Sequence, residues 1–259
     1  MPAVALPPPE RLYEVFGRVP RPERVPGCPH CVGAGEDACL LAVPLARLEP
    51  EALARYAAKA LSTWGGVAEF RYFLPRLLEC AAVDAFSYPD PEIVFGKLAT
   101  AGWTAWPPEE RAAVEDFLTG WWDTTLTTHP ARPPIDTVLC SLAATGLGLT
   151  PFLARWEALD GEAAIRHLRD FAEDGPSSAF WDRRGTAYAE VRAWLTGGRA
   201  GRAVEAAFSR VEDDTRAALL TGVDALIRAS EPPGGWARTG EAQTRSAVAP
   251  RSGGPSPAR

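Results

Sequence analysis

Apolar side chains return about every 3.6 residues through most of this 259-residue chain, and this spacing limits the fold more than any other feature. Leu53, Tyr56 and Ala60 begin one such series, and Val223 and Ile227 belong to the last. The spacing places apolar groups on one face of a helix. Because no stretch alternates apolar and polar residues for long enough to form a sheet, we predict an all-α fold.

Proline, acidic residues and glycine predict where helices begin and end. Pro50 and Pro108, each followed by an acidic residue, favour helix starts, and Gly65 favours a helix end. Because the connections are short, we expect antiparallel neighbours, arranged as a helical bundle or as a solenoid-like stack of helical hairpins. Further helices are predicted at about residues 135–145, 150–159, 161–173, 186–196 and 201–229.

The two ends of the chain differ from this helical region in composition. Residues 1–27 are rich in proline, so we expect an extended leader, with a short helix near Pro9–Phe16 as its one regular element. Residues 28–230 are predicted to form a single helical domain that begins with a cluster of cysteines. Residues 231–259 hold too few apolar side chains to offset the cost of ordering, so we predict a disordered tail.

Net charge and cysteine content limit the binding partners and the cellular location that we expect for this protein. The formal net charge is −6, which disfavours binding to nucleic acid or to an anionic membrane. We find no apolar run near the roughly 20 residues of a membrane span, and no secretory signal in the first residues. Five cysteines, an odd number, argue against a disulfide framework. We therefore expect a cytoplasmic protein with a protein partner.

Three of the cysteines, Cys28, Cys31 and Cys39, fall close together and form the candidate site. Their thiolates suit zinc, which takes four ligands in a structural site, and His129 is our candidate for the fourth. A second interpretation is a redox pair, because Cys-Pro-His-Cys occurs in thioredoxin-fold oxidants, although the proline-rich residues before Cys28 cannot form the core strand of that fold. A third is that these cysteines bind nothing. The remaining two, Cys80 and Cys140, fit buried positions in helices.

Tryptophan and histidine supply the other candidates. Trp122 is our candidate for an exposed interaction residue, because its neighbour Trp121 lies on the apolar stripe and successive residues point about 100° apart on a helix. His167 is expected at the surface or boundary of a helix. The sequence contains no zinc-protease, phosphate-loop or serine-hydrolase motif that would indicate an enzyme.

Five short motifs occur in combination: Cys-Pro-His-Cys at 28–31, RYAAKALSTWGG at 55–66, FRYFLPRLLE at 70–79, GKL at 96–98 and AGW at 101–103. Together they resemble a family of bacterial helical proteins for which no activity is established, and the resemblance spans roughly residues 28–125. It implies a helical fold and marks Cys28, His30 and Cys31 as a recurring feature. It implies no catalytic residue.

Three functional hypotheses follow from these observations. The first is a non-enzymatic interaction or scaffold protein with a structural zinc at the N-terminal cysteines. The second is a thiol redox protein or enzyme that uses Cys28 and Cys31. The third is an immunity- or antitoxin-like protein, because an acidic helical body would attract a basic partner.

Overall fold

The computed structural model describes residues 9–230, and this part of the chain is all-α, as predicted. Between these residues the β-type pairings are isolated bridges of Trp64 with Gly27 and with Ala60. None of the helices described has the length and apolar character needed to cross a membrane. The α-helices are α1 (Glu10–Phe16), α2 (Glu36–Leu40), α3 (Pro50–Lys59), α4 (Val67–Ala82), α5 (Pro91–Thr100), α6 (Pro108–Thr127), α7 (Ile135–Ala144), α8 (Thr150–Glu157), α9 (Glu162–Asp174), α10 (Gly185–Thr196), α11 (Arg199–Phe208) and α12 (Asp214–Ser230).

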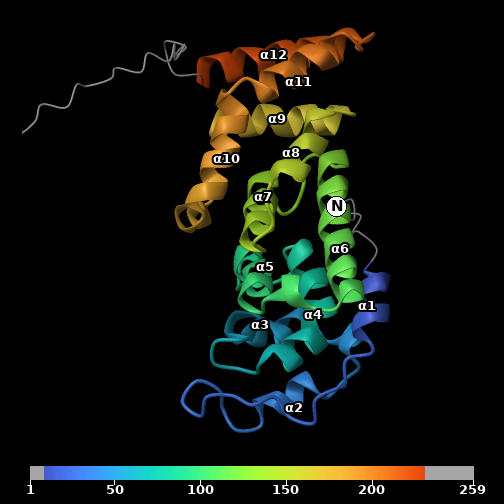
Figure 1. Ribbon diagram of the computed structural model, residues 1–259, viewed down its shortest axis with the longest axis vertical. Coiled ribbons are helices and arrows are strands. Elements are labelled where there is room, and N and C mark those ends of the chain that lie inside the picture. The colour runs from blue at the N-terminus through green and yellow to red at the C-terminus, as the bar shows by residue number, and fades with distance from the viewer. Residues whose placement is uncertain (1–8, 231–259) are drawn as a thin grey trace, which may run out of the picture.

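The helices form an elongated stack (Figure 1). At one end α2 and α3 lie beside the N-terminal segment, and at the other α9, α11 and α12 lie across the molecule in layers. Neighbours in space include α4 with α5, α5 with α7, and α9 with α12. Short 3-10 helices at Leu45–Arg47, Trp103–Ala105 and Ala179–Arg183 join some of these elements.

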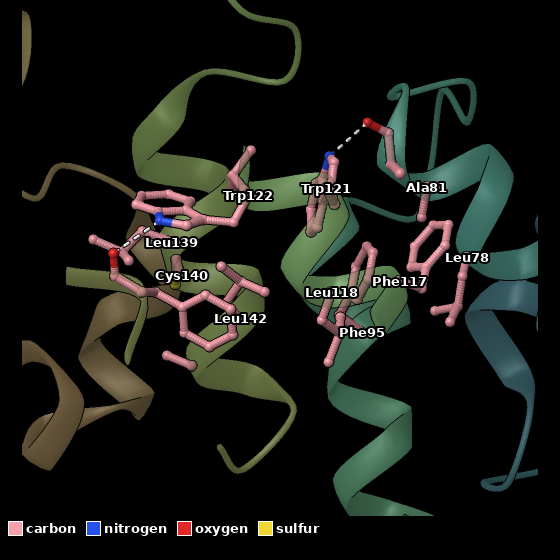
Figure 2. Close-up of a cluster of buried hydrophobic side chains, with 14 of the residues drawn as sticks. Leu78, Ala81, Phe95, Phe117, Leu118, Trp121, Trp122, Leu139, Cys140 and Leu142 are labelled. Carbon is pink, nitrogen blue, oxygen red and sulfur yellow. Dashed lines mark hydrogen bonds between the residues drawn. The ribbon is translucent and has the colours of Figure 1, made fainter. Parts of the chain in front are cut away.

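Helix α6 is the longest helix and packs on several sides. It contacts α1 near one end of the stack, and it contacts α7, α8 and α9 farther along. Trp121 and Trp122 therefore point into two different packed regions (Figure 2). The Trp121 ring stacks on Phe95 of α5 with centroids 4.4 Å apart, and its indole N–H donates to the Ala82 carbonyl at 3.1 Å.

The first described residues pack against this body. Leu12 and Phe16 of α1 are buried, and the Phe16 ring meets Trp106 edge-on at 5.9 Å. The short helix near Pro9–Phe16 is thus confirmed, and its apolar face packs on α4 and α6. The predicted division into a leader, 1–27, and a domain, 28–230, stays a prediction. The predicted tail, 231–259, and the first eight residues of the predicted leader lie outside the described residues.

The single helix predicted at about 201–229 is two helices, α11 and α12, which pack against each other. The break falls where Asp213 caps the second helix. Its carboxylate accepts the main-chain N–H groups of Thr215 and Arg216 at 3.3 and 3.0 Å. Aspartate at this position satisfies amide groups that have no partner inside the helix, so it favours a new helix start over a continuous helix.

Candidate functional site

The Cys28–Cys31 segment is a tight turn held against the loop between α3 and α4. The main-chain N–H of Cys31 donates to the Cys28 carbonyl at 2.9 Å, which closes the turn. The Cys28 N–H donates to the Thr63 carbonyl at 2.8 Å, and the Gly65 N–H donates to the Pro26 carbonyl at 2.6 Å. Gly65 has φ of +69°, a conformation that glycine adopts at little cost. Two main-chain bonds therefore fix the position of the turn.

The thiol of Cys28 has an environment that favours its charged form. The main-chain N–H of His30 has the largest effect in lowering its pKa, followed by the Cys31 thiol and the Cys31 N–H. The ammonium group of Lys59 adds an attractive charge. Together they hold the pKa of Cys28 below its usual value, so a larger fraction of this thiol is thiolate at neutral pH.

Two basic side chains of α3 reach the same turn. The Lys59 ammonium group and the Arg55 guanidinium group both donate to the Cys31 carbonyl, and the Arg55 distance is 3.0 Å. Arg55 also pairs with Glu36 of α2 at 2.6 Å. These contacts place positive charge beside the two thiols and tie the turn to α2 and α3.

The other two predicted zinc ligands do not complete a metal site with this pair. Cys39 lies in α2 and is exposed. His129 follows α6, and its Nε2 lies 2.7 Å from an oxygen of Asp170 in α9. Helix α9 lies toward the opposite end of the stack from α2 (Figure 1). Residues 9–230 contain no group of three or more His, Cys, Asp or Glu side chains arranged to hold a metal ion. The structure therefore places His129 beside Asp170 of α9 and not with the cysteines, and the zinc hypothesis stays a prediction.

The remaining cysteines are buried, as predicted. Burial raises the pKa of Cys80 to about 11 and that of Cys140 to about 12. Both thiols are therefore protonated and unreactive at neutral pH. Within the described part of the chain, the cysteines that are not buried are therefore Cys28, Cys31 and Cys39.

Trp122 is fully buried, so the prediction of an exposed interaction residue is wrong. Its indole N–H donates to the Phe152 carbonyl at 2.9 Å. Its ring meets Trp156 edge-on with centroids 5.5 Å apart. Figure 2 shows it directed toward the α7 side chains Leu139 and Leu142. The physical reason is that α6 is covered on both of the faces that Trp121 and Trp122 occupy.

A second candidate site brings together two histidines that are far apart in the sequence. A cavity of about 270 Å³ lies between the loop after α6, the start of α7 and the end of α9, and both His129 and His167 line it. Their rings meet edge-on with centroids 4.8 Å apart. Burial alone would raise the pKa of Asp170, but hydrogen bonds from His129 and Arg169 hold it below its usual value.

His167 is 3% exposed, which differs from the surface or boundary position we expected. Its Nε2 lies 3.0 Å from the Thr125 carbonyl and 2.9 Å from the Thr128 carbonyl, so Nε2 carries the proton and donates to both. Burial is the main cause that lowers the pKa of His167, and the nearby His129 lowers it further. The ring is therefore neutral at neutral pH.

Asp136 of α7 holds the loop that forms another wall of this cavity. One carboxylate oxygen accepts the main-chain N–H groups of Ser177 and Ser178 at 3.1 and 2.6 Å. The other accepts the indole N–H of Trp181 at 2.7 Å. Because these donors come from successive residues after α9, the wall is anchored at several points.

Sequence reasoning missed this second site because it weighed each histidine alone. His167 and Asp170 are three residues apart and therefore share a face of α9, and that spacing was the available signal. The contribution of His129 depends on how the loop after α6 returns to α9, which spacing does not reveal.

Comparisons with models of known protein families, with curated proteins and with solved structures found no match to this chain. The resemblance to a bacterial helical family at residues 28–125 therefore stays a prediction.

Proposed function

We propose that the Cys28–Cys31 turn is a redox-active dithiol that exchanges with disulfides, carried on a helical scaffold. The observation that supports this proposal is the environment of Cys28, where two amide groups, a neighbouring thiol and the Lys59 ammonium group all favour the thiolate. The thiolate is the nucleophile in disulfide exchange. Cys31 lies in the same turn, which its main-chain N–H closes by donating to the Cys28 carbonyl at 2.9 Å, so we assign it the role of the second thiol.

The proposed reaction transfers two electrons. The Cys28 thiolate attacks one sulfur of a disulfide substrate, so a mixed disulfide forms and the first substrate thiolate leaves. The Cys31 thiolate then attacks the Cys28 sulfur, which releases the second substrate thiolate and leaves a Cys28–Cys31 disulfide. The leaving thiolates take up the protons that the two cysteines lose. The substrate disulfide is thereby reduced and the protein dithiol is oxidised.

Thiolate stabilisation at this turn has a local cause. In thioredoxin-type proteins the reactive thiol lies at the start of a helix packed on a sheet, whereas here α2 begins only at Glu36, after the turn. The amides of the turn itself, with Lys59 of α3, act in place of the helix end. The proposal therefore implies thiol chemistry without thioredoxin architecture.

Two of the hypotheses drawn from sequence are kept as alternatives. A structural zinc is the first, and it would need two ligands besides Cys28 and Cys31. A role limited to binding a protein partner, including an immunity-like role, is the second, and the negative net charge supports a basic partner.

Redox titration of the full chain separates these possibilities. The protein is equilibrated with mixtures of reduced and oxidised glutathione, free thiols are alkylated, and the products are mapped by mass spectrometry. We expect a reversible Cys28–Cys31 disulfide in the wild type and in the matched control Cys39→Ser, and no such disulfide in Cys28→Ser. We also expect iodoacetamide to modify Cys28 faster than the exposed Cys39 at neutral pH.

Two results would overturn the proposal. One is a Cys28 that alkylates no faster than Cys39 and forms no disulfide with Cys31 at any glutathione ratio. The other is one equivalent of zinc in the purified protein that is lost on Cys28→Ser, which would support the structural zinc instead. As an internal check, Lys59→Met should slow alkylation of Cys28, because it removes a charge that favours the thiolate.

A further inference from the structure

The cavity lined by His129 and His167 is a concave site that the proposed thiol chemistry does not use. It is enclosed by the loop after α6, the first turn of α7 and the last turn of α9. We propose that it binds a small organic cation, a protonated amine that carries a short apolar group. Three features favour such a ligand: the charge of the cavity, the C-terminal end of α9 and the apolar part of the wall.

The charged groups that face the cavity are mostly negative. Asp136 comes from α7, and Asp170 and Asp174 come from α9. None of the residues that line the cavity is lysine or arginine. Arg169 reaches Asp170 from outside the cavity at 3.1 Å, and His129 contacts the same carboxylate. Asp136 accepts hydrogen bonds from uncharged donors only, so it keeps its negative charge. Three carboxylates against the two basic partners of Asp170 leave a potential that attracts a cation and repels an anion.

The last turn of α9 strengthens this preference. A helix ends with carbonyl groups that have no partner inside the helix, and these carry partial negative charge. The last turn of α9 contains no basic residue to offset that charge. Asp174 is exposed, and within residues 9–230 its side chain makes no hydrogen bond or ion pair, although its position at a helix C-terminus is unfavourable for an acid. A cation in the cavity would relieve both unfavourable features.

The neutral state of His167 keeps positive charge out of the cavity. Its Nε2–H is committed to the Thr125 and Thr128 carbonyls, so the unprotonated Nδ1 has only a lone pair to offer. His129 is directed to Asp170 by its 2.7 Å contact. Neither ring therefore provides a free cation that would compete with a ligand.

The apolar part of the wall indicates the rest of the ligand. Pro130, Pro134, Ile135 and Phe171 line the cavity together with the carboxylates. Such a mixture suits a ligand with one charged end and a compact hydrocarbon body, since ligand sites combine apolar walls with a few placed polar groups. A bare metal ion would gain nothing from this apolar surface.

Nuclear magnetic resonance of the histidine rings gives a direct test, because the chain has three histidines and two of them line the cavity. The probes are benzylamine, benzyl alcohol and sodium benzoate, which share a ring and differ in charge, titrated at constant ionic strength. We expect benzylamine to shift the His129 and His167 resonances in a saturable way and to leave His30 unmoved. Benzyl alcohol should bind about tenfold more weakly, a loss of about 1.4 kcal/mol, and benzoate should give no saturable shift.

A pair of variants in α9 tests which carboxylate contributes to benzylamine binding. Asp174→Asn should weaken benzylamine binding by about three- to fivefold, because it removes an exposed ionic partner. Glu173→Gln removes the same charge from the neighbouring residue of α9, which does not line the cavity, and should leave binding unchanged. The proposal is wrong if benzoate or benzyl alcohol binds as tightly as benzylamine. It is equally wrong if benzylamine leaves His129 and His167 unmoved, or if His30 shifts with the same concentration dependence.

Discussion

The clearest test of the packing around α6 is replacement of Trp122. This side chain is fully buried, donates a hydrogen bond to the Phe152 carbonyl and contacts the Trp156 ring. Truncation of a buried tryptophan to alanine costs about 3–5 kcal/mol through lost burial and the cavity left behind. The lost hydrogen bond adds about 1 kcal/mol. We therefore expect Trp122→Ala to lower the free energy of unfolding by about 4–6 kcal/mol, a large part of the total stability of a typical domain.

Urea denaturation followed by far-ultraviolet circular dichroism measures this difference. Because Trp122→Ala can leave too little folded protein, Trp122→Phe serves as the milder variant, and it should cost about 1–2 kcal/mol because the ring stays and the donor is lost. Val43→Ala is the matched control, since Val43 is 37% exposed, and it should change stability by less than about 0.5 kcal/mol. A Trp122→Ala variant as stable as the Val43→Ala control would refute the packing described for α6.

Two further predictions concern buried charges. Burial raises the pKa of Glu92 above its usual 4.5, so the folded state binds this proton more tightly than the unfolded state does. The contribution of Glu92 to stability therefore falls as the pH rises from 4.5 through the pKa of the folded state. Glu92→Gln, which keeps an acceptor for the Ser178 hydroxyl, should remove that loss, and unfolding curves that change equally with pH in wild type and variant would contradict it. Arg71→Met should cost about 2–3 kcal/mol, because it leaves the buried Glu110 carboxylate without its partner and removes the cation 5.7 Å above the Trp106 ring. Adding Glu110→Gln should recover part of that loss in the same denaturation assay, and a double variant less stable than Arg71→Met would count against the pairing.

The helical fold was predictable because the spacing of apolar residues reflects burial directly. Proline followed by an acid marked the starts of α3 and α6 correctly, since these residues act within one turn of a helix. The break between α11 and α12 was missed because the cap at Asp213 lies inside a series that keeps its apolar spacing across the gap. Local signals therefore locate helices well and interruptions less well.

Burial and site geometry were harder to predict because they depend on which helices meet. Trp122 was expected to be exposed because one face of α6 was assumed to be enough for packing, yet neighbours cover a second face. Cys28 and Cys31 were found because their spacing alone brings them together. The pairing of His129 with Asp170 joins a loop to a helix 41 residues later, and the cavity forms only when both are placed.

The many neighbours of α6 also determine whether the chain can be separated into fragments that fold. One flank of this helix is covered by α1, near the start of the chain, and others by α8 and α9, far along it. Cutting the polypeptide on either side of α6 would expose the apolar surface of this helix to water in the fragment that contains it. We therefore expect residues 9–230 to unfold as one cooperative unit, and fragments that separate the thiol turn from the histidine cavity to be poor tools for studying either.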